Sequence, residues 1–145
     1  MRIYISATVM QLEHLRDNGI VKMWETLAGL NFGMAPQWRD SQGEDDEEVL
    51  EFELTQLALN ECRAAHVEIY PDQEITQDFT RVVLVAEHPD LWVRILEAEM
   101  AVALFSQDLK LEYVKAIFVG FTDDAQDLSW FAPTEIESAL EFCRA

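Results

Sequence analysis

Arg81-Val82-Val83-Leu84-Val85-Ala86 is the most strand-like segment of this chain, since four branched apolar residues follow the arginine in succession. Short apolar runs rich in valine are typical of β-strands. An unbroken run, without polar residues at every second position, predicts a strand that is covered on both faces. Strands of that kind are typical of parallel sheets, because helices cover both faces of such sheets. We therefore expect residues 81–86 to be a central strand of an α/β domain.

Strands and helices are expected to alternate on both sides of this segment. Alternation of this kind favours a single α/β domain over residues 1–145, with a mixed, mostly parallel sheet of four or five strands and helices packed against it. An α+β fold is the alternative. The segment 91–107 is compatible with either a helix or a strand. We expect a short helix or turn in it, followed by a strand near 101–105. The other expected strands are residues 2–7, 30–36 and 116–121, and the expected helices are residues 9–18, 20–28, 43–67 and 136–143.

The chain is strongly acidic and yet rich in apolar residues. It has 28 acidic and 10 basic residues, a formal net charge of −18, and 50% hydrophobic residues. A chain with this much apolar content folds, so the acids are expected on its surface. Nucleic-acid binding depends on basic residues that neutralise phosphates, and anionic membranes attract basic segments, so both partners are excluded. A basic protein or a cation remains compatible with the charge, and so does a purely solubilising surface.

The cysteines and the N-terminal sequence indicate a soluble, cytoplasmic protein. Cys62 and Cys143 both fall on apolar helical positions, which predicts reduced thiols in the core. The sequence enters a strand pattern at its start, where a signal peptide would have an apolar helical segment. No apolar run approaches the roughly 20 residues of a membrane-spanning helix.

Three segments resemble a family of small, uncharacterised actinobacterial proteins that is classed as a domain of unknown function. They are Met1-Arg2-Ile3-Tyr4-Ile5-Ser6-Ala7-Thr8, Asp46-Glu47-Glu48-Val49-Leu50-Glu51-Phe52 and the strand at 81–86. The resemblance implies an acidic α/β domain in the bacterial cytosol. It implies no activity, because the family has none established.

Polar residues follow several of the expected strands. In a parallel sheet the carboxyl ends of the strands meet at one edge, where ligands bind. Carboxylates and hydroxyl groups suit Mg²⁺ or Mn²⁺, and a carboxylate or imidazole can act as a general base. The candidate metal ligands are therefore Thr8, Asp123 and Asp124, and the candidate catalytic residues are Glu87 and His88. Solvated loop residues without a shared site are the alternative.

Two pairs of neighbouring residues in expected loops, each containing a tryptophan, are candidates for an interface. Trp38 stands beside Arg39, and Trp130 stands beside Phe131 after an acidic segment. Trp and Arg are enriched at protein interfaces, although loops also fold such rings back onto the core. Together with the charge, these pairs favour a protein-interaction or regulatory module with a basic partner, and a homo-oligomer is also compatible. A small metal-assisted enzyme is the alternative, and no cofactor other than a divalent cation is expected.

Overall fold

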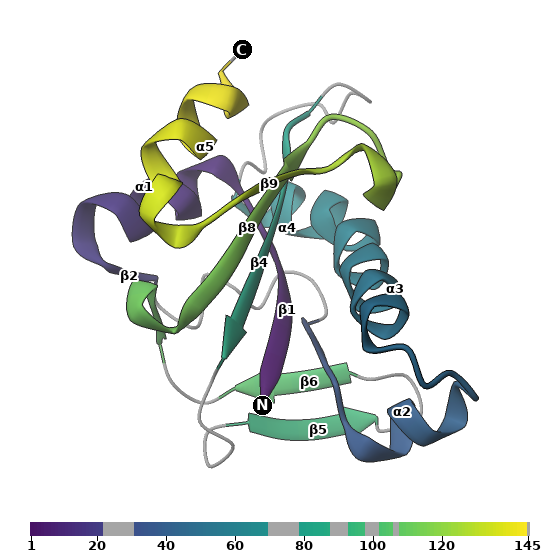
Figure 1. Cartoon of the computed structure of the whole chain (residues 1–145). Coiled ribbons are helices and arrows are strands. Elements are labelled where there is room, and N and C mark those ends of the chain that lie inside the picture. The colour runs from purple at the N-terminus through teal and green to yellow at the C-terminus, as the bar shows by residue number, and fades with distance from the viewer. Residues whose placement is uncertain (22–30, 70–78, 88–92, 98–101, 106–107, 145) are drawn as a thin grey trace.

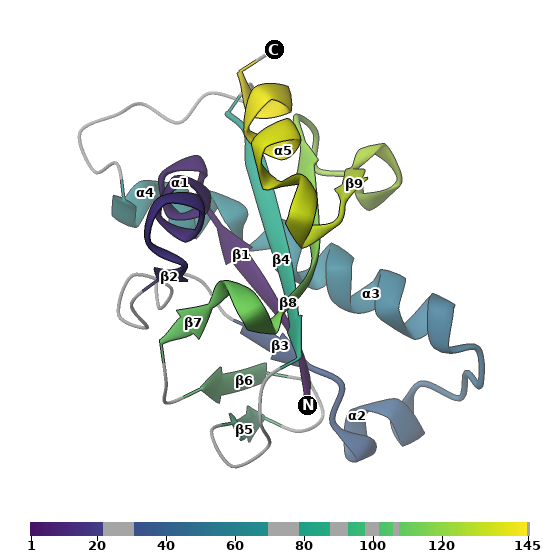
Figure 2. The same cartoon turned by 60° about the vertical axis from the view of Figure 1, so that its left-hand side comes forward.

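The computed structural model describes residues 1–21, 31–69, 79–87, 93–97, 102–105 and 108–144 (Figure 1). Within these residues, seven strands form one sheet in the order β5-β6-β3-β1-β4-β8-β9, and β2 pairs with β7 (Figure 2). Five α-helices accompany the strands in the same described segments. The strands are β1 Arg2–Ala7, β2 Ile20–Val21, β3 Asn31–Gly33, β4 Arg81–Glu87, β5 Val93–Glu97, β6 Val102–Phe105, β7 Leu109–Lys110, β8 Val114–Gly120 and β9 Ser129–Phe131. The helices are α1 Val9–Asn18, α2 Pro36–Ser41, α3 Glu47–Asn60, α4 Cys62–Ile69 and α5 Ile136–Cys143.

Every pair of neighbouring strands in the large sheet is antiparallel, so the prediction of a mostly parallel sheet is wrong. The register of β1 and β4 runs from Arg2 opposite Glu87 to Ala7 opposite Val82. Strand β8 is also antiparallel to β4, with Gly120 opposite Arg81. The fold therefore corresponds to the α+β alternative.

The position of β1 explains the error. Strands β3 and β4 are both antiparallel to β1, so they run in the same direction as each other. The connection between them contains α2, α3 and α4, as expected for a crossover between parallel strands. However, β1 lies between them and pairs with both. A linear alternation of strands and helices does not reveal this insertion, because it gives the order along the chain and not the order in the sheet.

Helices cover both faces of the sheet, which is why β4 is apolar along nearly its whole length. Figure 1 shows α1 and α5 on one side of β1, β4 and β8, and α3 on the other. Side chains of a strand alternate between the two faces. Accordingly Val82 and Leu84 belong to different clusters from Val83 and Val85. Burial on both faces was predicted correctly, whereas parallel pairing does not follow from it.

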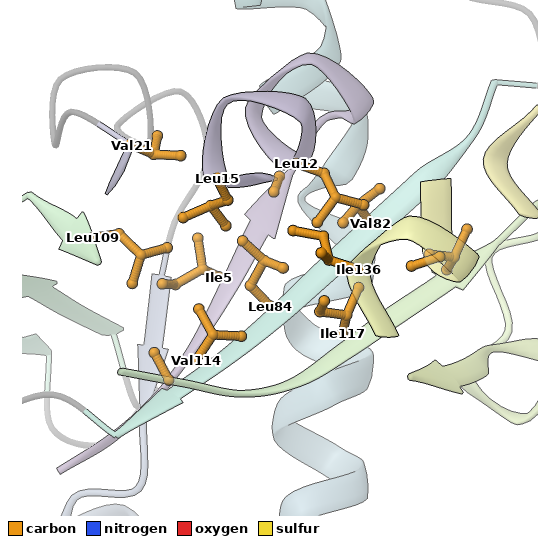
Figure 3. Close-up of a cluster of buried hydrophobic side chains, with 14 of the residues drawn as sticks. Ile5, Leu12, Leu15, Val21, Val82, Leu84, Leu109, Val114, Ile117 and Ile136 are labelled. Carbon is orange, nitrogen blue, oxygen red and sulfur yellow. The ribbon is translucent and has the colours of Figure 1, made fainter. Parts of the chain in front are cut away.

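The cluster beneath α1 and α5 is aliphatic (Figure 3). Leu12 and Leu15 of α1 and Ile136 of α5 lie over Ile5, Leu84 and Ile117 of the sheet. The cluster on the other face contains more aromatic residues. Its members include Tyr4, Phe32, Trp38, Leu50, Leu54, Leu59, Phe79, Val83 and Val85.

Local signals fix the ends of α1 as the sequence indicates. The Thr8 hydroxyl accepts a hydrogen bond from the Gln11 amide, and the Gln11 side chain accepts one from the Thr8 amide. This reciprocal pair is a capping box. Gly19 follows the helix with a φ of 70°, a conformation that favours glycine.

Several element boundaries differ from the expected ones. Pro36 begins α2 instead of ending a strand, since proline fits the first helical position. The expected helix at 43–67 is divided into α3 and α4, with Glu61 between them. Ile20 and Val21 form β2 where a helix was expected, and residues 22–28 of that expectation lie outside the described residues. Residues 93–97 form strand β5 where a short helix or turn was expected. The expected strand near 101–105 is confirmed as β6.

Candidate functional site

The structure separates the residues that the parallel sheet was expected to bring together. Thr8 follows β1, and Asp123 and Asp124 follow β8, at the end of the sheet where β4 begins. Glu87 lies at the opposite end of β4, beside Arg2. Six residue steps of about 3.4 Å place these two ends about 20 Å apart. His88 lies outside the described residues.

Three of the expected ligands make structural contacts. Thr8 is buried and caps α1, and the Asp124 carboxylate accepts the amide hydrogen of Gln126 at 2.9 Å. Asp123 accepts a hydrogen bond from Arg81 at 2.7 Å. Among the described residues, no three His, Cys, Asp or Glu side chains are grouped so that they could hold a metal ion.

Arg81 is a buried cation that the sequence did not single out. Its residue is 1% exposed, although the side chain of its partner Asp123 is 69% exposed. The guanidinium donates to the carbonyl oxygens of Phe79 and Phe121 at 2.8 and 2.9 Å, and lies 4.2 Å from the centre of the Phe79 ring. These bonds tie the start of β4 to the loop after β8. The only sequence signal is an arginine at the edge of an apolar run.

The four candidate interface residues do not form one surface. Trp38 is buried in α2, within the cluster beneath α3. Phe131 packs against the cluster on the opposite face, with its ring 5.7 Å from that of Phe142. Arg39 forms an ion pair with Glu47 at 3.0 Å. Trp130, which is 58% exposed on β9, is the member of the set that presents a large aromatic surface to solvent.

Trp130 borders a groove between α3 and the β8–β9 part of the sheet. The groove has a volume of about 250 Å³. Helix α3 supplies one wall, and the face of β1, β4 and β8 supplies the floor. The lining residues are Arg2, Tyr4, Glu51, Thr55, Val85, Lys115, Ala116, Phe118 and Trp130.

Tyr4 lies at the floor of this groove. The residue is 1% exposed, and its hydroxyl donates no hydrogen bond within the described part of the chain. Burial raises the pKa of the phenol above its usual value and the neighbouring Glu51 carboxylate raises it further, whereas the charge and hydrogen bond of Arg2 lower it by less. The hydroxyl is therefore protonated at neutral pH and is available as a donor.

Arg2 connects this groove to a second hollow. Its guanidinium pairs with the carboxylate of Glu51 and, at 3.4 Å, with that of Glu87. The second hollow has a volume of about 470 Å³ and is lined by polar residues that include Arg2, Arg39, Glu47, Glu51 and Glu87. Glu87 thus lies in an ion-pair network with Arg2 at the end of the sheet remote from Asp123.

A β-bulge places Lys115 at the groove. Ala116 is opposite Val85 and Val114 is opposite Ala86, so Lys115 is an extra residue in β8. Val114 therefore fills the cluster beneath α1 and α5, while Lys115 is exposed and lines the groove. Bulges are common next to functional sites, where they redirect a side chain. A pattern of apolar residues did not reveal the bulge, because the irregularity depends on the partner strand.

Comparisons with known proteins identify the family. A family model described as a family of unknown function, DUF6912, matches residues 1–128, so the chain belongs to that family. This confirms the resemblance to an uncharacterised family, whereas an actinobacterial origin stays a prediction. No curated protein matches the chain, and no solved structure matches it. Over the described residues, the structure contains no helix with the length and apolar character needed to cross a membrane.

Proposed function

We propose that this DUF6912 member is a protein-interaction or regulatory module that binds a basic partner in the cytoplasm. The proposal depends chiefly on one observation. Val49 and Phe52 are exposed on α3, 42% and 41% respectively, and acidic residues stand on both sides of them. Large apolar side chains exposed within a charged border are typical of interaction surfaces.

The acids at the start of α3 form one side of this surface. Glu44, Asp45, Asp46, Glu47 and Glu48 are all exposed. The Asp46 carboxylate caps the helix by accepting the Glu48 amide hydrogen at 3.0 Å. Acids here also favour the positive end of the helix dipole, which was the interpretation from sequence. Helix stability accounts for Asp46 and its neighbours in the first turn, but it does not account for the exposed apolar pair that follows.

The loop after β8 forms the other side. Gln56 lies one turn beyond Phe52 on the same flank of α3. The Gln56 side chain donates to the Asp123 carbonyl oxygen and accepts from the Ala125 amide, both at 2.9 Å. The exposed carboxylates of Asp123, Asp124 and Asp127 are therefore held beside the far end of this flank. We call the whole region the acidic α3 surface, comprising residues 44–49, 52, 53, 123, 124 and 127.

A basic partner fits this surface by charge. The chain has a net charge of −18, which attracts cationic surfaces and repels a second copy of the same face. Apolar contacts at Val49 and Phe52 then supply attraction that salt does not screen. We therefore expect a hetero-complex at this surface instead of a homo-oligomer.

The test is a pull-down that compares matched variants. The tagged protein is incubated with an extract of its source cells at low ionic strength and at about 0.15 M, where the Debye length is about 8 Å. Wild-type protein is expected to retain a basic protein at both ionic strengths, and more of it at the lower one. Removing two charges with E44Q/E48Q and removing the apolar contact with F52S are each expected to reduce the retained amount.

The matched control is E112Q/E141Q, which removes the same charge from exposed positions elsewhere. Equal retention by this control and by wild type supports a specific surface. If E44Q/E48Q and E112Q/E141Q reduce the retained amount of the basic protein equally, the binding would be a non-specific charge effect. Retention that is insensitive to E44Q/E48Q and to F52S would contradict the proposal.

A further inference from the structure

The groove at Tyr4 has the features of a small-molecule site. We propose that it binds a small carboxylate that carries a single aromatic ring. This inference is independent of the acidic α3 surface, because none of the residues that line the groove belongs to that surface. It concerns a ligand of different charge, since the groove contains cations whereas the α3 surface contains acids.

The groove offers more hydrogen-bond donors than acceptors. The buried Tyr4 hydroxyl is protonated, and its proton has no acceptor among the described residues, because the neighbouring Arg2 guanidinium can only donate. A buried polar group without a partner costs about 1–3 kcal/mol, so an arriving acceptor gains the bond without displacing another one. Lys115 adds three further donors, and no ion pair involves it in the described structure. Thr55 is not counted among these donors, because its hydroxyl already donates to the Glu51 carbonyl oxygen at 2.8 Å.

The charges favour a ligand with one negative charge. Two cations, Arg2 and Lys115, and one carboxylate, Glu51, line the groove. The guanidinium of Arg2 is already paired with Glu51 and with Glu87. Lys115 therefore supplies the remaining positive charge. A dianion would meet stronger repulsion from a chain of net charge −18.

The walls favour a flat apolar group. Phe118 and Trp130 are cross-strand neighbours of β8 and β9, and both line the groove. Val85 and Ala116 add aliphatic surface below them. Aromatic rings pack on one another in offset or edge-to-face arrangements, which add to the burial of apolar area. The volume of about 250 Å³ is below the roughly 300–1,000 Å³ of pockets for drug-sized ligands, which limits the ligand to one ring.

The geometry gives each part of such a ligand a contact. The carboxylate accepts hydrogen bonds from Tyr4 and Lys115, and the ring lies against Trp130 and Phe118. Trp130 is exposed to solvent, and a bound ring would cover it. The bulge at Lys115 places the cation on this face, where a regular strand would have directed it into the aliphatic cluster on the other face.

Phenylacetate is the probe, and the indole N–H signal of Trp130 in a ¹⁵N-correlation spectrum is the readout. The signal is assigned with W130F. We expect a saturable shift of this signal in wild-type protein. K115M is expected to weaken binding by about 10-fold or more, because a hydrogen bond to a charged group is worth about 1.5–3 kcal/mol. K110M, which removes an exposed lysine outside the groove, is the matched control and should bind like wild type.

Two further comparisons test the chemistry of the ligand. Y4F removes the hydroxyl alone and is expected to weaken binding by about 10-fold or more, because its bond to the ligand carboxylate is also a bond to a charged group. Phenylacetamide, which has no charge, should bind at least 10-fold more weakly than phenylacetate. Absence of a saturable shift, equal affinity for the acid and the amide, or wild-type affinity in K115M would each overturn the assignment. E44Q/E48Q should leave phenylacetate binding unchanged, so failure of the groove and failure of the α3 surface are distinguishable.

Discussion

Arg81 and Asp123 form an ion pair between a buried guanidinium and an exposed carboxylate, which joins the start of β4 to the loop after β8. Asp123 was a candidate metal ligand because acids follow a strand. In the structure its carboxylate neutralises a buried guanidinium at 2.7 Å. Buried arginines need a partner, since an unpaired charge in the interior is strongly unfavourable. Pairing between residues 42 positions apart is not encoded in either local segment, so the sequence could not reveal it.

Replacing Asp123 tests this pairing. D123N keeps the shape but removes the charge opposite Arg81, and we expect the free energy of unfolding to fall by about 1–3 kcal/mol. D45N, at an exposed position in the acidic run, is the control and should change stability by less than about 0.5 kcal/mol. Urea denaturation in EDTA measures both. A loss for D123N that occurs only when Mg²⁺ is present would indicate a metal ligand instead.

For the Tyr4 hydroxyl we expect the opposite effect: its removal should stabilise the protein, whereas D123N should destabilise it. Y4F removes a buried donor that has no acceptor among the described residues and leaves the ring in place, so we expect it to raise the free energy of unfolding by about 1 kcal/mol. Chemical denaturation in the absence of ligand measures the change. A destabilised Y4F would mean that the hydroxyl has a partner in the folded protein, which would remove the main support for the groove as a site.

The two thiols are expected to be inert and to limit stability at alkaline pH. Burial raises the pKa of Cys62 from 9.0 to about 12 and that of Cys143 to about 11. Folding therefore favours the protonated thiols, so the unfolded chain loses protons first and stability falls as pH rises above about 9. Denaturation at pH 8 and pH 10 should show this fall, and C62A should reduce it. A thiol reagent at pH 8 should label the unfolded chain but not the folded one.

At the scale of single elements, most boundaries with a local chemical signal were predictable. The start of α1 at Thr8 and its end at Gly19 depend on side chains within a few residues, and both were correct. Helix α3 was expected as part of one longer helix, because no glycine or proline marks the turn at Glu61. Trp38 was expected in a loop since Pro36 was interpreted as the end of a strand instead of the start of a helix.

The bulge in β8 is an element whose purpose can be tested by deletion. Deleting Lys115 would place Val114 next to Ala116, which restores a regular alternation opposite Ala86 and Val85. We expect this deletion to keep the melting temperature within a few degrees, because both clusters keep their side chains. Deleting Val114 instead would place Lys115 opposite Ala86, facing the aliphatic cluster, and should unfold the protein.

Circular dichroism during a thermal scan measures both deletions. If removal of Lys115 were as damaging as removal of Val114, the bulge would be a requirement of the fold. If removal of Lys115 is tolerated, the bulge serves the groove, and the deletion should also abolish the shift of the Trp130 signal with phenylacetate.

For the whole molecule, burial and charge were predictable and strand order was not. The apolar run of β4 correctly indicated cover on both faces, and the acidic residues of the α3 surface are exposed as expected. Parallel pairing was inferred from alternation, which also arises when an N-terminal strand inserts between the two strands of a crossover. The candidate site at one sheet edge depended on that pairing, so its residues are distributed over two ends.

The net charge makes a prediction about stability in salt. Exposed carboxylates in a chain of charge −18 repel one another in the folded state, and salt screens this repulsion. We expect the melting temperature to rise as sodium chloride increases from low concentration to about 0.15 M, where the Debye length is about 8 Å. Glucose at equal osmolality is the control. A fall in melting temperature would show that attractive ion pairs dominate the surface.

The antiparallel pairing of β1 and β4 is the feature on which the floor of the groove and the separation of Glu87 from Thr8 depend. Paired residues in antiparallel strands have Cα atoms about 4.5–5.5 Å apart, which suits a disulfide. Arg2 is opposite Glu87, whereas Val82 is opposite Ala7. Mass spectrometry after mild oxidation should therefore find an intramolecular disulfide in R2C/E87C and none in R2C/V82C. A disulfide in R2C/V82C and not in R2C/E87C would show parallel strands and contradict the account.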